Sequence, residues 1–369
     1  MGHKMSSKYS ARIIESMEEW SQLADDWNKL LRDSKSNNIF LTFEWLYTRA
    51  ECFLDADRRL FILAFYEKDK IVGLAPWCLH RVRIVGVKAR QIEFLGIPEM
   101  GSDYMDVIIK RGKEKEVTDS IYSFLCKEKS NVWDSMLLND IPSGSLFLLY
   151  FIDNVRDSGK HIGLREGAFC PIVVLPDSWE DYFSEISANR REQFSRHFRL
   201  LEREGKVSYE SIVQGPDSGF NLERFTSLYR VWWGKKQNEH FYNHLKNFSE
   251  KCMAQSWLQM DFLSVNGREV AGLLHCRYNG SLLMYLMAVD KTFNKNISIG
   301  NILIGLCLEE AISNGINIYD FLRGNEAYKF HWASSGLRSL SVKFYQKGLS
   351  SVGRISVELA KDFARVLLR

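Results

Sequence analysis

Residues 317–332 read Asn-Ile-Tyr-Asp-Phe-Leu-Arg-Gly-Asn-Glu-Ala-Tyr-Lys-Phe-His-Trp, and this stretch indicates how the chain folds. It begins with an alternation of period two, which predicts a strand with Asp320 on one face and Tyr319 and Phe321 on the other. Gly324 then ends the strand. Several charged groups follow at once, beside aromatic rings that favour burial. Charge next to buried aromatic rings indicates a cleft.

The sequence before this stretch predicts a strand, a loop and a helix. Residues 282–289 are strongly apolar, residues 290–300 are polar, and residues 301–313 are rich in Ile and Leu. The pair Asn314-Gly315 suits the left-handed end of such a helix. The order strand, loop, helix, strand predicts a crossover unit whose two strands run parallel. The N-terminus of its helix would present unpaired N–H groups to an anion.

The run DFLRGNEAYKFHW, preceded by SIGNILIGLCLEEAISNG, resembles the C-terminal signature of GNAT-type acyltransferases grouped with bacterial cellulose- and exopolysaccharide-biosynthesis proteins. That group is distantly similar to the FemX-like peptidoglycan aminoacyl transferases, which have two GNAT domains. The resemblance is strongest in this signature and weaker over most of the remaining chain. It implies an α/β fold of tandem GNAT-like domains, with mixed central sheets flanked by helices.

A long-period repeat also indicates two similar halves. The phrase DKIVGLAPW at residues 69–77 is matched by GREVAGLLHC at residues 267–276, and each follows a strand, which predicts two β-hairpins. Duplication of a whole domain explains such a repeat, and chance similarity between two hairpins is the alternative. We predict an N-terminal GNAT-like domain at residues 1–165, a C-terminal catalytic GNAT-like domain at 166–350 and a C-terminal amphipathic helix at 351–369.

The composition is that of a globular protein with large cores. The chain has 369 residues, of which 46% are hydrophobic and 26% are charged. No apolar run reaches the roughly 18 to 20 residues of a membrane span, and no signal peptide is recognised, so we expect a cytoplasmic protein without stable membrane insertion. Seven cysteines without a Cys-x-x-Cys pair argue against a disulfide framework or zinc ribbon. A net charge of +3 does not indicate DNA binding.

The candidate catalytic residues lie in the opening stretch. By resemblance, Tyr328 matches a tyrosine that protonates the departing thiolate in acyl transfer. Asp320 or Glu326 is the candidate base, because a carboxylate near buried aromatic rings has its pKa raised toward neutrality. Arg323 and Lys329 would hold anionic groups of the acceptor or the cofactor. The alternative is a strand end whose salt bridges only fix the loop.

The resemblance implies acetyl-CoA or a longer acyl-CoA as co-substrate. Its arm would lie where the strands at residues 282–289 and 316–322 splay apart, and its pyrophosphate near residues 298–301. The candidate binding residues are Val289, Ser298, Gly300 and Asn301. The usual Arg/Gln-x-x-Gly-x-Gly/Ala loop is not matched there, since Ile297 and Ile302 replace two of its positions. We expect no metal, because the spaced pair His240 and His244 lacks a marked third ligand.

Two further groups are candidates for substrate binding. Asp103 and Tyr104 would be polar hooks for an acceptor in a cleft between the domains, or else parts of a turn. Arg190 and Arg191 begin a predicted helix with five arginines, which suits the phosphates of coenzyme A, of a nucleotide- or lipid-linked sugar, or of tRNA. The alternative is a solvated helix face whose arginines are balanced by glutamates.

The expected function is transfer of an acyl group from acyl-CoA to an amine or hydroxyl of a sugar or similar precursor of a cell-surface or exported polysaccharide. Two other interpretations stay open. One is FemX-like transfer of an aminoacyl group from tRNA, and the other is a catalytically silent GNAT scaffold within a polysaccharide-assembly complex. The sequence does not decide the acceptor or the length of the acyl chain.

Overall fold

The computed structural model describes residues 8–84, 87–96, 101–160, 162–213, 218–233 and 239–346. The predicted C-terminal helix at 351–369 lies outside these residues. Within the described part of the chain, no helix combines the length and the apolar character needed to cross a membrane. All seven cysteines are described and none forms a disulfide.

The chain forms two compact units. The first comprises the described residues up to Gly167 and those from Arg338 onward, and the second comprises Ala168–Leu337. The chain leaves the first unit along β9 (Ile162–Val174) and returns along β15 (Ser335–Tyr345). Each of these two strands therefore contributes residues to both units.

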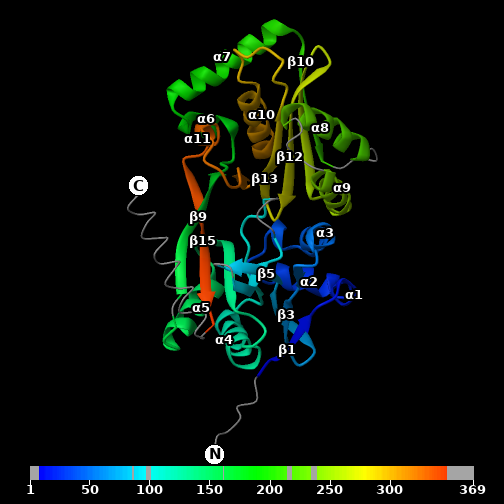
Figure 1. Cartoon of the computed structure of the whole chain (residues 1–369). Helices are drawn as coiled ribbons and strands as arrows, with labels where there is room; N and C mark the ends of the chain where they lie inside the picture. The colour runs from blue at the N-terminus through cyan, green and yellow to red at the C-terminus, as the bar shows by residue number, and fades with distance from the viewer. Residues whose placement is uncertain are drawn as a thin grey trace, which may run out of the picture. The chain divides into compact units, whose positions relative to one another are not determined.

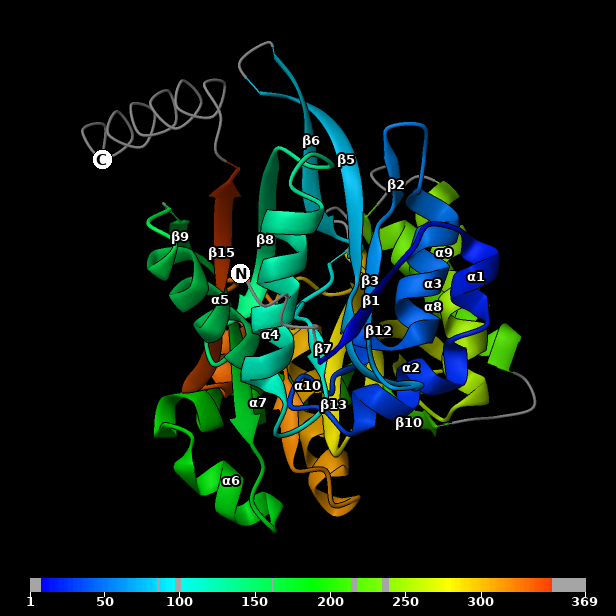
Figure 2. The same cartoon turned by 90° about the horizontal axis from the view of Figure 1, so that it is seen from below.

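The first unit contains two groups of strands with helices packed on them. One group has the order β1-β3-β4-β7, and in the other β15, β8, β6, β5 and β2 are successive neighbours. Helices α4 and α5 lie side by side in this unit (Figure 2). Its elements are β1 (Ser10–Ile14), α1 (Met17–Ser21), α2 (Ala24–Arg32), η1 (Ile39–Leu41), α3 (Phe43–Phe53), β2 (Arg58–Leu60), β3 (Ile62–Glu67), β4 (Lys70–Ala75), β5 (Trp77–Ile84), β6 (Val87–Phe94), β7 (Ile108–Ile109), α4 (Glu114–Ser123), η3 (Phe124–Glu128), β8 (Ser135–Pro142) and α5 (Leu146–Asp157).

The second unit is built on the strand order β10-β11-β12-β13-β14-β9. Helix α10 covers one face of these strands, and α8 and α9 cover the other (Figure 1). Because α10 is apolar on nearly all sides, it is buried along most of its length. The elements are α6 (Trp179–Glu185), α7 (Ala188–Glu204), β10 (Val207–Val213), α8 (Ser218–Trp233), α9 (Glu239–Ala254), β11 (Leu258–Val265), β12 (Arg268–Tyr278), β13 (Ser281–Val289), α10 (Ile299–Ser313), β14 (Ile318–Asp320) and α11 (Lys329–Trp332).

The predicted crossover unit is present in the second unit. β13 and β14 pair in parallel, and α10 connects them. Gly315 follows the helix with a φ of +67°, the left-handed conformation expected at its end. The hairpin predicted at residues 69–77 is present as β3 and β4, but its second strand is expected to run through Pro76 as far as residue 79, and this extension is wrong, since β4 ends at Ala75 and β5 begins at Trp77 with different neighbours. Proline has no N–H to donate, so it ends strand pairing at this position.

Candidate functional site

The parallel pairing of β13 with β14 is short. Parallel pairing joins Ser281–Leu283 to Ile318–Asp320, and among the described residues it does not extend along the rest of β13. On the other edge of β13, the register with β12 shifts after Leu274 and leaves Tyr285 as an extra residue. Such a β-bulge bends a strand, and this one lies two residues beyond the last pair with β14. Beyond Leu283 and Asp320 the two parallel strands no longer pair, and β14 itself ends there.

The four candidate cofactor-binding residues lie together at the C-terminal end of β13 and the first turn of α10. A Cβ atom on Gly300 would lie 3.4 Å from Val289 Cγ2. Asn301 Nδ2 donates to Ser298 Oγ at 3.0 Å. Two N–H groups at this helix start are already used, because the Ser298 amide donates to His197 Nδ1 at 3.3 Å and the Ile299 amide donates to the Ile297 carbonyl oxygen at 3.0 Å. The site thus offers a helix N-terminus for an anion, with these two amides occupied by the protein itself.

The loop after β14 is held by Lys329, which is 4% exposed. Its Nζ donates to the carbonyl oxygens of Leu322 at 3.3 Å and Arg323 at 2.5 Å. The same Nζ lies 3.2 Å from Glu326 Oε2. This arrangement agrees with the interpretation in which charges at the strand end fix the loop. The anion-binding roles of Arg323 and Lys329 stay predictions.

The three candidate catalytic groups have different surroundings. Asp320 is buried and accepts a hydrogen bond from the Leu322 N–H at 2.7 Å, and Leu322 has a φ of +55°, which is costly for a residue with a side chain. The Glu326 side chain is 53% exposed. Burial, and then the negative charge of Glu326, raise the pKa of Tyr328. Tyr328 therefore holds its proton at neutral pH, a state suited to donating it.

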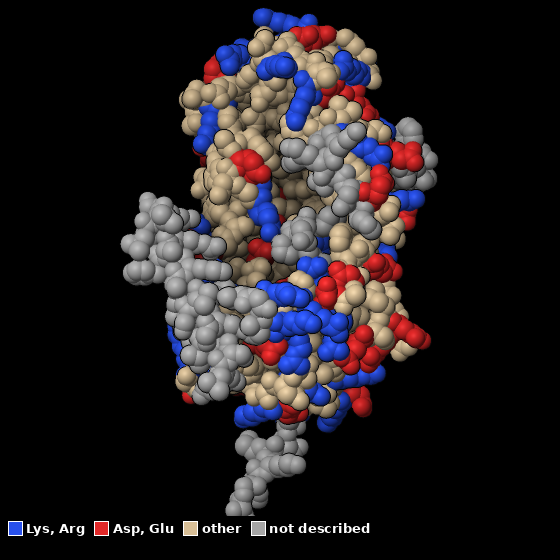
Figure 3. All heavy atoms as spheres, in the orientation of Figure 1, with Lys and Arg blue, Asp and Glu red and all other residues tan. Residues whose placement is uncertain are grey.

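Helix α7 packs on α10 through apolar side chains and carries its charges outward. Arg191 Nη1 donates to the Ser184 carbonyl oxygen at 3.1 Å, and Arg199 pairs with Glu192 at 3.1 Å. Where α7 lies, Lys and Arg side chains (blue) are interspersed with Asp and Glu (red) in Figure 3. Arg190 is near His331, whose pKa is lowered by burial and then by the positive charge of Arg190. Phosphate binding by Arg190 and Arg191 stays a prediction.

The other two candidate substrate-binding residues lie in the first unit. Asp103 and Tyr104 are 3% and 9% exposed, and Tyr104 has a φ of +55° with its carbonyl oxygen bonded to Asn38 Nδ2 at 3.0 Å. Sequence reasoning passed over their neighbour Asp106, which accepts hydrogen bonds from the Ser145 hydroxyl and the Val107 N–H, both at 2.8 Å. Burial raises the pKa of Asp106 to about 7, and these hydrogen bonds oppose the rise only in part.

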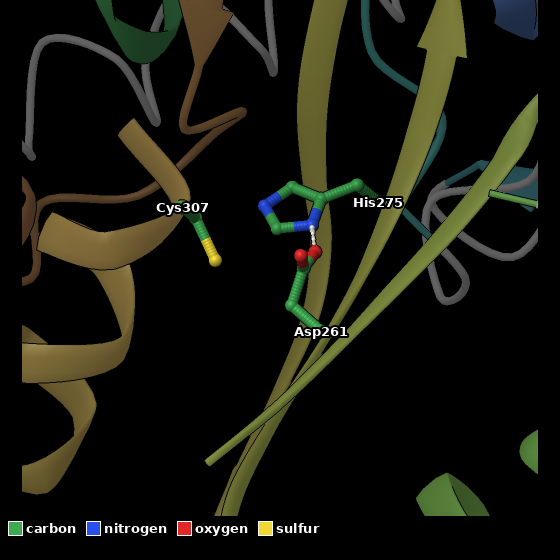
Figure 4. Close-up of side chains that lie close together, drawn as sticks. All are labelled: Asp261, His275 and Cys307. Atoms are coloured by element: carbon green, nitrogen blue, oxygen red, sulfur yellow. Dashed lines mark hydrogen bonds and ion pairs between the residues drawn. The ribbon is translucent and has the colours of Figure 1, made fainter. Parts of the chain in front are cut away.

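Sequence reasoning also missed a buried polar network on the α10 face of the second unit (Figure 4). His275 on β12 contacts Asp261 Oδ2 on β11 through Nδ1 at 2.9 Å, and Tyr319 Oη on β14 through Nε2 at 2.8 Å. Tyr209 donates to Asp261 Oδ1 at 2.8 Å. Burial favours a raised pKa for Asp261, but hydrogen bonds from His275 and other partners outweigh it, and the net pKa is lowered. In the sequence, the signal for this network is one carboxylate, Asp261, and one histidine, His275, each within an otherwise apolar strand.

One set of potential metal ligands occurs in this network among the described residues. Ligand atoms of Asp261, His275 and Cys307 lie within 4.8 Å of one another. Both ring nitrogens of His275 and both oxygens of Asp261 already take part in hydrogen bonds. Burial and then Asp261 raise the pKa of the Cys307 thiol, which opposes formation of the thiolate that binds metals. The donor set is therefore better described as a hydrogen-bonded network than as a metal centre.

This chain is similar to known proteins in part of its sequence and in its fold. Residues 188–330 match the family described as Acetyltransferase (GNAT) domain. No curated protein matches the sequence. The crystal structure of FemX is similar with a TM-score of 0.57 and 10% identity, covering 91% of this chain and 97% of that one. The C-terminal domain of a putative lysylphosphatidylglycerol synthetase from Agrobacterium fabrum has a TM-score of 0.53 and 11% identity, covering 94% and 96%. L-PGS from Bacillus licheniformis has a TM-score of 0.51 and 16% identity, covering 90% and 94%.

At these identities the solved structures show the fold, whereas the matched domain indicates the class of enzyme. The expected α/β fold with mixed sheets flanked by helices is confirmed. The family match covers β10 to β14, together with the opening between β13 and β14 and the start of α10. The expectation of a GNAT-superfamily acyltransferase is confirmed by this acetyltransferase (GNAT) domain at residues 188–330.

Proposed function

We propose that the protein transfers an acyl group from acyl-CoA, most simply acetyl-CoA, to an amine or hydroxyl of a sugar or similar precursor of a cell-surface or exported polysaccharide. The observation that carries the proposal is that the pairing of β13 with β14 ends at Leu283 and Asp320, while β13 continues to Val289. An extended pantetheine arm carries amides and adds to an open strand edge much as a peptide strand does. The α10 N-terminus, at the far end of β13, suits the pyrophosphate.

The candidate residues have complementary tasks in this reaction. Tyr328 keeps its proton and would donate it to the departing thiolate. Asp320 or Glu326 would accept the proton of the acceptor amine or hydroxyl. Lys329 supports the loop that carries these groups through its bonds to the carbonyls of Leu322 and Arg323. We assign the catalytic residues to a C-terminal domain at 166–350 and the acceptor hooks Asp103 and Tyr104 to a domain at 1–165, in a cytoplasmic protein.

Aminoacyl transfer from tRNA is a second candidate because of one specific observation. The Ser298 amide is bonded to His197, so the start of α10 offers fewer free N–H groups to a pyrophosphate than an unoccupied helix N-terminus would. The arginines of α7 would suit a polyanion such as tRNA. FemX and the putative lysylphosphatidylglycerol synthetase share the fold with this chain, which is compatible with either donor.

Isothermal titration with acetyl-CoA and with a longer acyl-CoA tests the donor. We expect micromolar binding to the unaltered protein and a loss of detectable binding in Gly300→Trp, because the indole would fill the space at Met287 and Val289 where the helix start meets β13. Gly144→Trp is the matched control, since a Cβ atom there has no neighbour within 4 Å. Circular dichroism of both variants checks that they fold.

Tyr328→Phe separates binding from chemistry. We expect this variant to bind acyl-CoA as the unaltered protein does and to lose most of its transfer rate, because proton donation contributes about 100-fold or more in acid–base catalysis. No binding of either thioester by the unaltered protein would overturn the acyl-CoA proposal. Transfer from aminoacyl-tRNA would then be assayed with the same variants.

A further inference from the structure

The buried contacts of His275 join strands that are not neighbours. We call Asp261, His275 and Tyr319 the buried polar chain, and all three side chains are 0% exposed. His275 lies on β12 and Tyr319 on β14, with β13 between them in the sheet. The hydrogen bond of 2.8 Å between His275 Nε2 and Tyr319 Oη therefore spans β13 on the face covered by α10.

This contact is located where the parallel strands separate. The register shift between β12 and β13 falls directly before His275. Tyr319 is paired with Leu282, one position before the last parallel pair, Leu283 with Asp320. The buried polar chain thus ties β14 to β12 at the closed end of the opening.

β14 is a short strand, so its register depends on few backbone pairs. It has three residues, which pair with three residues of β13 and three of β9. A shift by one residue would exchange the faces of Tyr319 and Asp320, because side chains alternate along a strand. Tyr319 reaches His275 only in the present register, and Asp320 then lies on the opposite face. The next residues form the turn that Asp320 and Lys329 hold.

The partner of His275 gives the tie its strength. Asp261 is fully buried and also accepts hydrogen bonds from Tyr209 and Gln259. A carboxylate held in this way orients the imidazole through Nδ1 and strengthens the hydrogen bond at Nε2. Apolar side chains surround these groups, so water does not compete for the contacts.

We propose that the buried polar chain is a positioning device for the transfer site: through Tyr319 it fixes the register of β14 and so holds Asp320 and the turn of Leu322 and Arg323 at the opening between β13 and β14. Asp261, His275 and Tyr319 do not touch substrate in this role. The effect on catalysis rests on the proposed function, whereas the effect on β14 does not.

Tyr319→Phe tests the proposal, because it removes one hydroxyl and leaves the ring that fills the core. Hydrogen–deuterium exchange at residues 318–323 is expected to become about tenfold faster, from the loss of one buried hydrogen bond. Acyl-CoA affinity is expected to stay within about twofold while kcat falls about tenfold, because a displaced Asp320 affects chemistry more than binding of the cofactor arm.

Tyr209→Phe is the matched control. It also removes a phenol hydroxyl, in this case one bonded to Asp261, but β10 is separated from β14 by β11, β12 and β13 in the strand order. We expect exchange at residues 318–323 and kcat to change clearly less in this variant than in Tyr319→Phe, because Gln259 and His275 still hold Asp261 and the bond to Tyr319 is kept. Equal exchange in Tyr319→Phe and the unaltered protein would overturn the positioning role. Faster exchange in a protein that binds no acyl-CoA would support the positioning role and leave only the proposed function refuted.

Discussion

The hairpin β3–β4 of the first unit and the hairpin β11–β12 of the second have the same frame. Gly73 pairs with Phe65 in one, and Gly272 pairs with Phe262 in the other. Each hairpin is preceded in its sheet by an antiparallel neighbour, β1 or β10. Each also has a register shift near its turn.

The two hairpins differ at the positions that carry chemistry. With Gly73 aligned to Gly272, Pro76 occupies the position of His275, and Ala64 occupies that of Asp261. Pro76 ends β4 and directs the chain into β5, whereas β12 continues through His275 to Tyr278. The same frame therefore serves as a scaffold in one unit and holds a buried polar chain in the other.

Two buried carboxylates, Asp106 in the first unit and Asp261 in the second, also differ in their surroundings. Asp261 has His275 as a partner that can carry a positive charge, and its pKa is lowered despite its burial. Asp106 is bonded, among the residues that the structure describes, to the uncharged Ser145 hydroxyl and Val107 amide, and burial raises its pKa to about 7. A buried carboxylate stays ionised only where the protein supplies enough compensation. The comparison predicts opposite dependences of stability on pH for the two groups.

Asp106→Asn is expected to have the largest effect. In the unaltered protein, folded Asp106 binds a proton up to about pH 7, whereas the unfolded chain releases it near pH 4, so stability falls as pH rises between these values. The fall amounts to on the order of 4 kcal/mol at most for a rise of this size. Asn does not titrate, so urea unfolding of Asp106→Asn should lack this fall and give the more stable protein at pH 8.

Asp57→Asn is the control for this measurement, because Asp57 is exposed in the same unit. It should keep the pH dependence of the unaltered protein. A constant difference between Asp106→Asn and the unaltered protein from pH 5 to pH 8 would show that Asp106 does not titrate in this range.

The sequence was sufficient for features that depend on local pattern and chain order. The apolar run at 282–289, the Ile- and Leu-rich helix and Asn314-Gly315 predicted the parallel crossover, because each signal acts within a few residues. The buried polar chain could not be predicted in the same way. Asp261, His275 and Tyr319 are separated in sequence and meet only through the strand order, so each alone appears as an isolated polar residue in an apolar strand.

Sequence reasoning was also unable to assign the charges around Glu326 and Lys329. Their types indicated either a cleft or a clamped loop, and only the three-dimensional path of the loop brings the Leu322 and Arg323 carbonyls to Lys329 Nζ. The catalytic and cofactor-binding roles depend on how a substrate lies against these side chains, so they stay predictions.

Substitution of the paired glycines distinguishes the packing on the two hairpins. A Cβ atom on Gly73 would lie 2.5 Å from Val117 Cγ1 of α4, whereas one on Gly272 would lie 3.3 Å from Phe225 Cδ2 of α8. Val117 is buried and β-branched, so it adjusts poorly. Urea unfolding should give a loss of about 2–3 kcal/mol for Gly73→Ala and about 1 kcal/mol for Gly272→Ala. Equal losses would mean that both helices move aside equally well.

The turn of the first hairpin gives the smallest expected effect, and the turn of the second provides the comparison. Lys68 and Asn266 each begin a turn with φ values of 57° and 52°, but only Asn is tolerated well in this left-handed conformation. Lys68 is exposed, so Lys68→Asn should stabilise the protein by about 0.5 kcal/mol by relieving backbone strain alone. Asn266→Lys should cost more, about 1–2 kcal/mol, because Asn266 Oδ1 also accepts from the Lys206 N–H at 2.9 Å. Urea unfolding measures both changes, and a loss of stability in Lys68→Asn would show that the first turn depends on the lysine side chain.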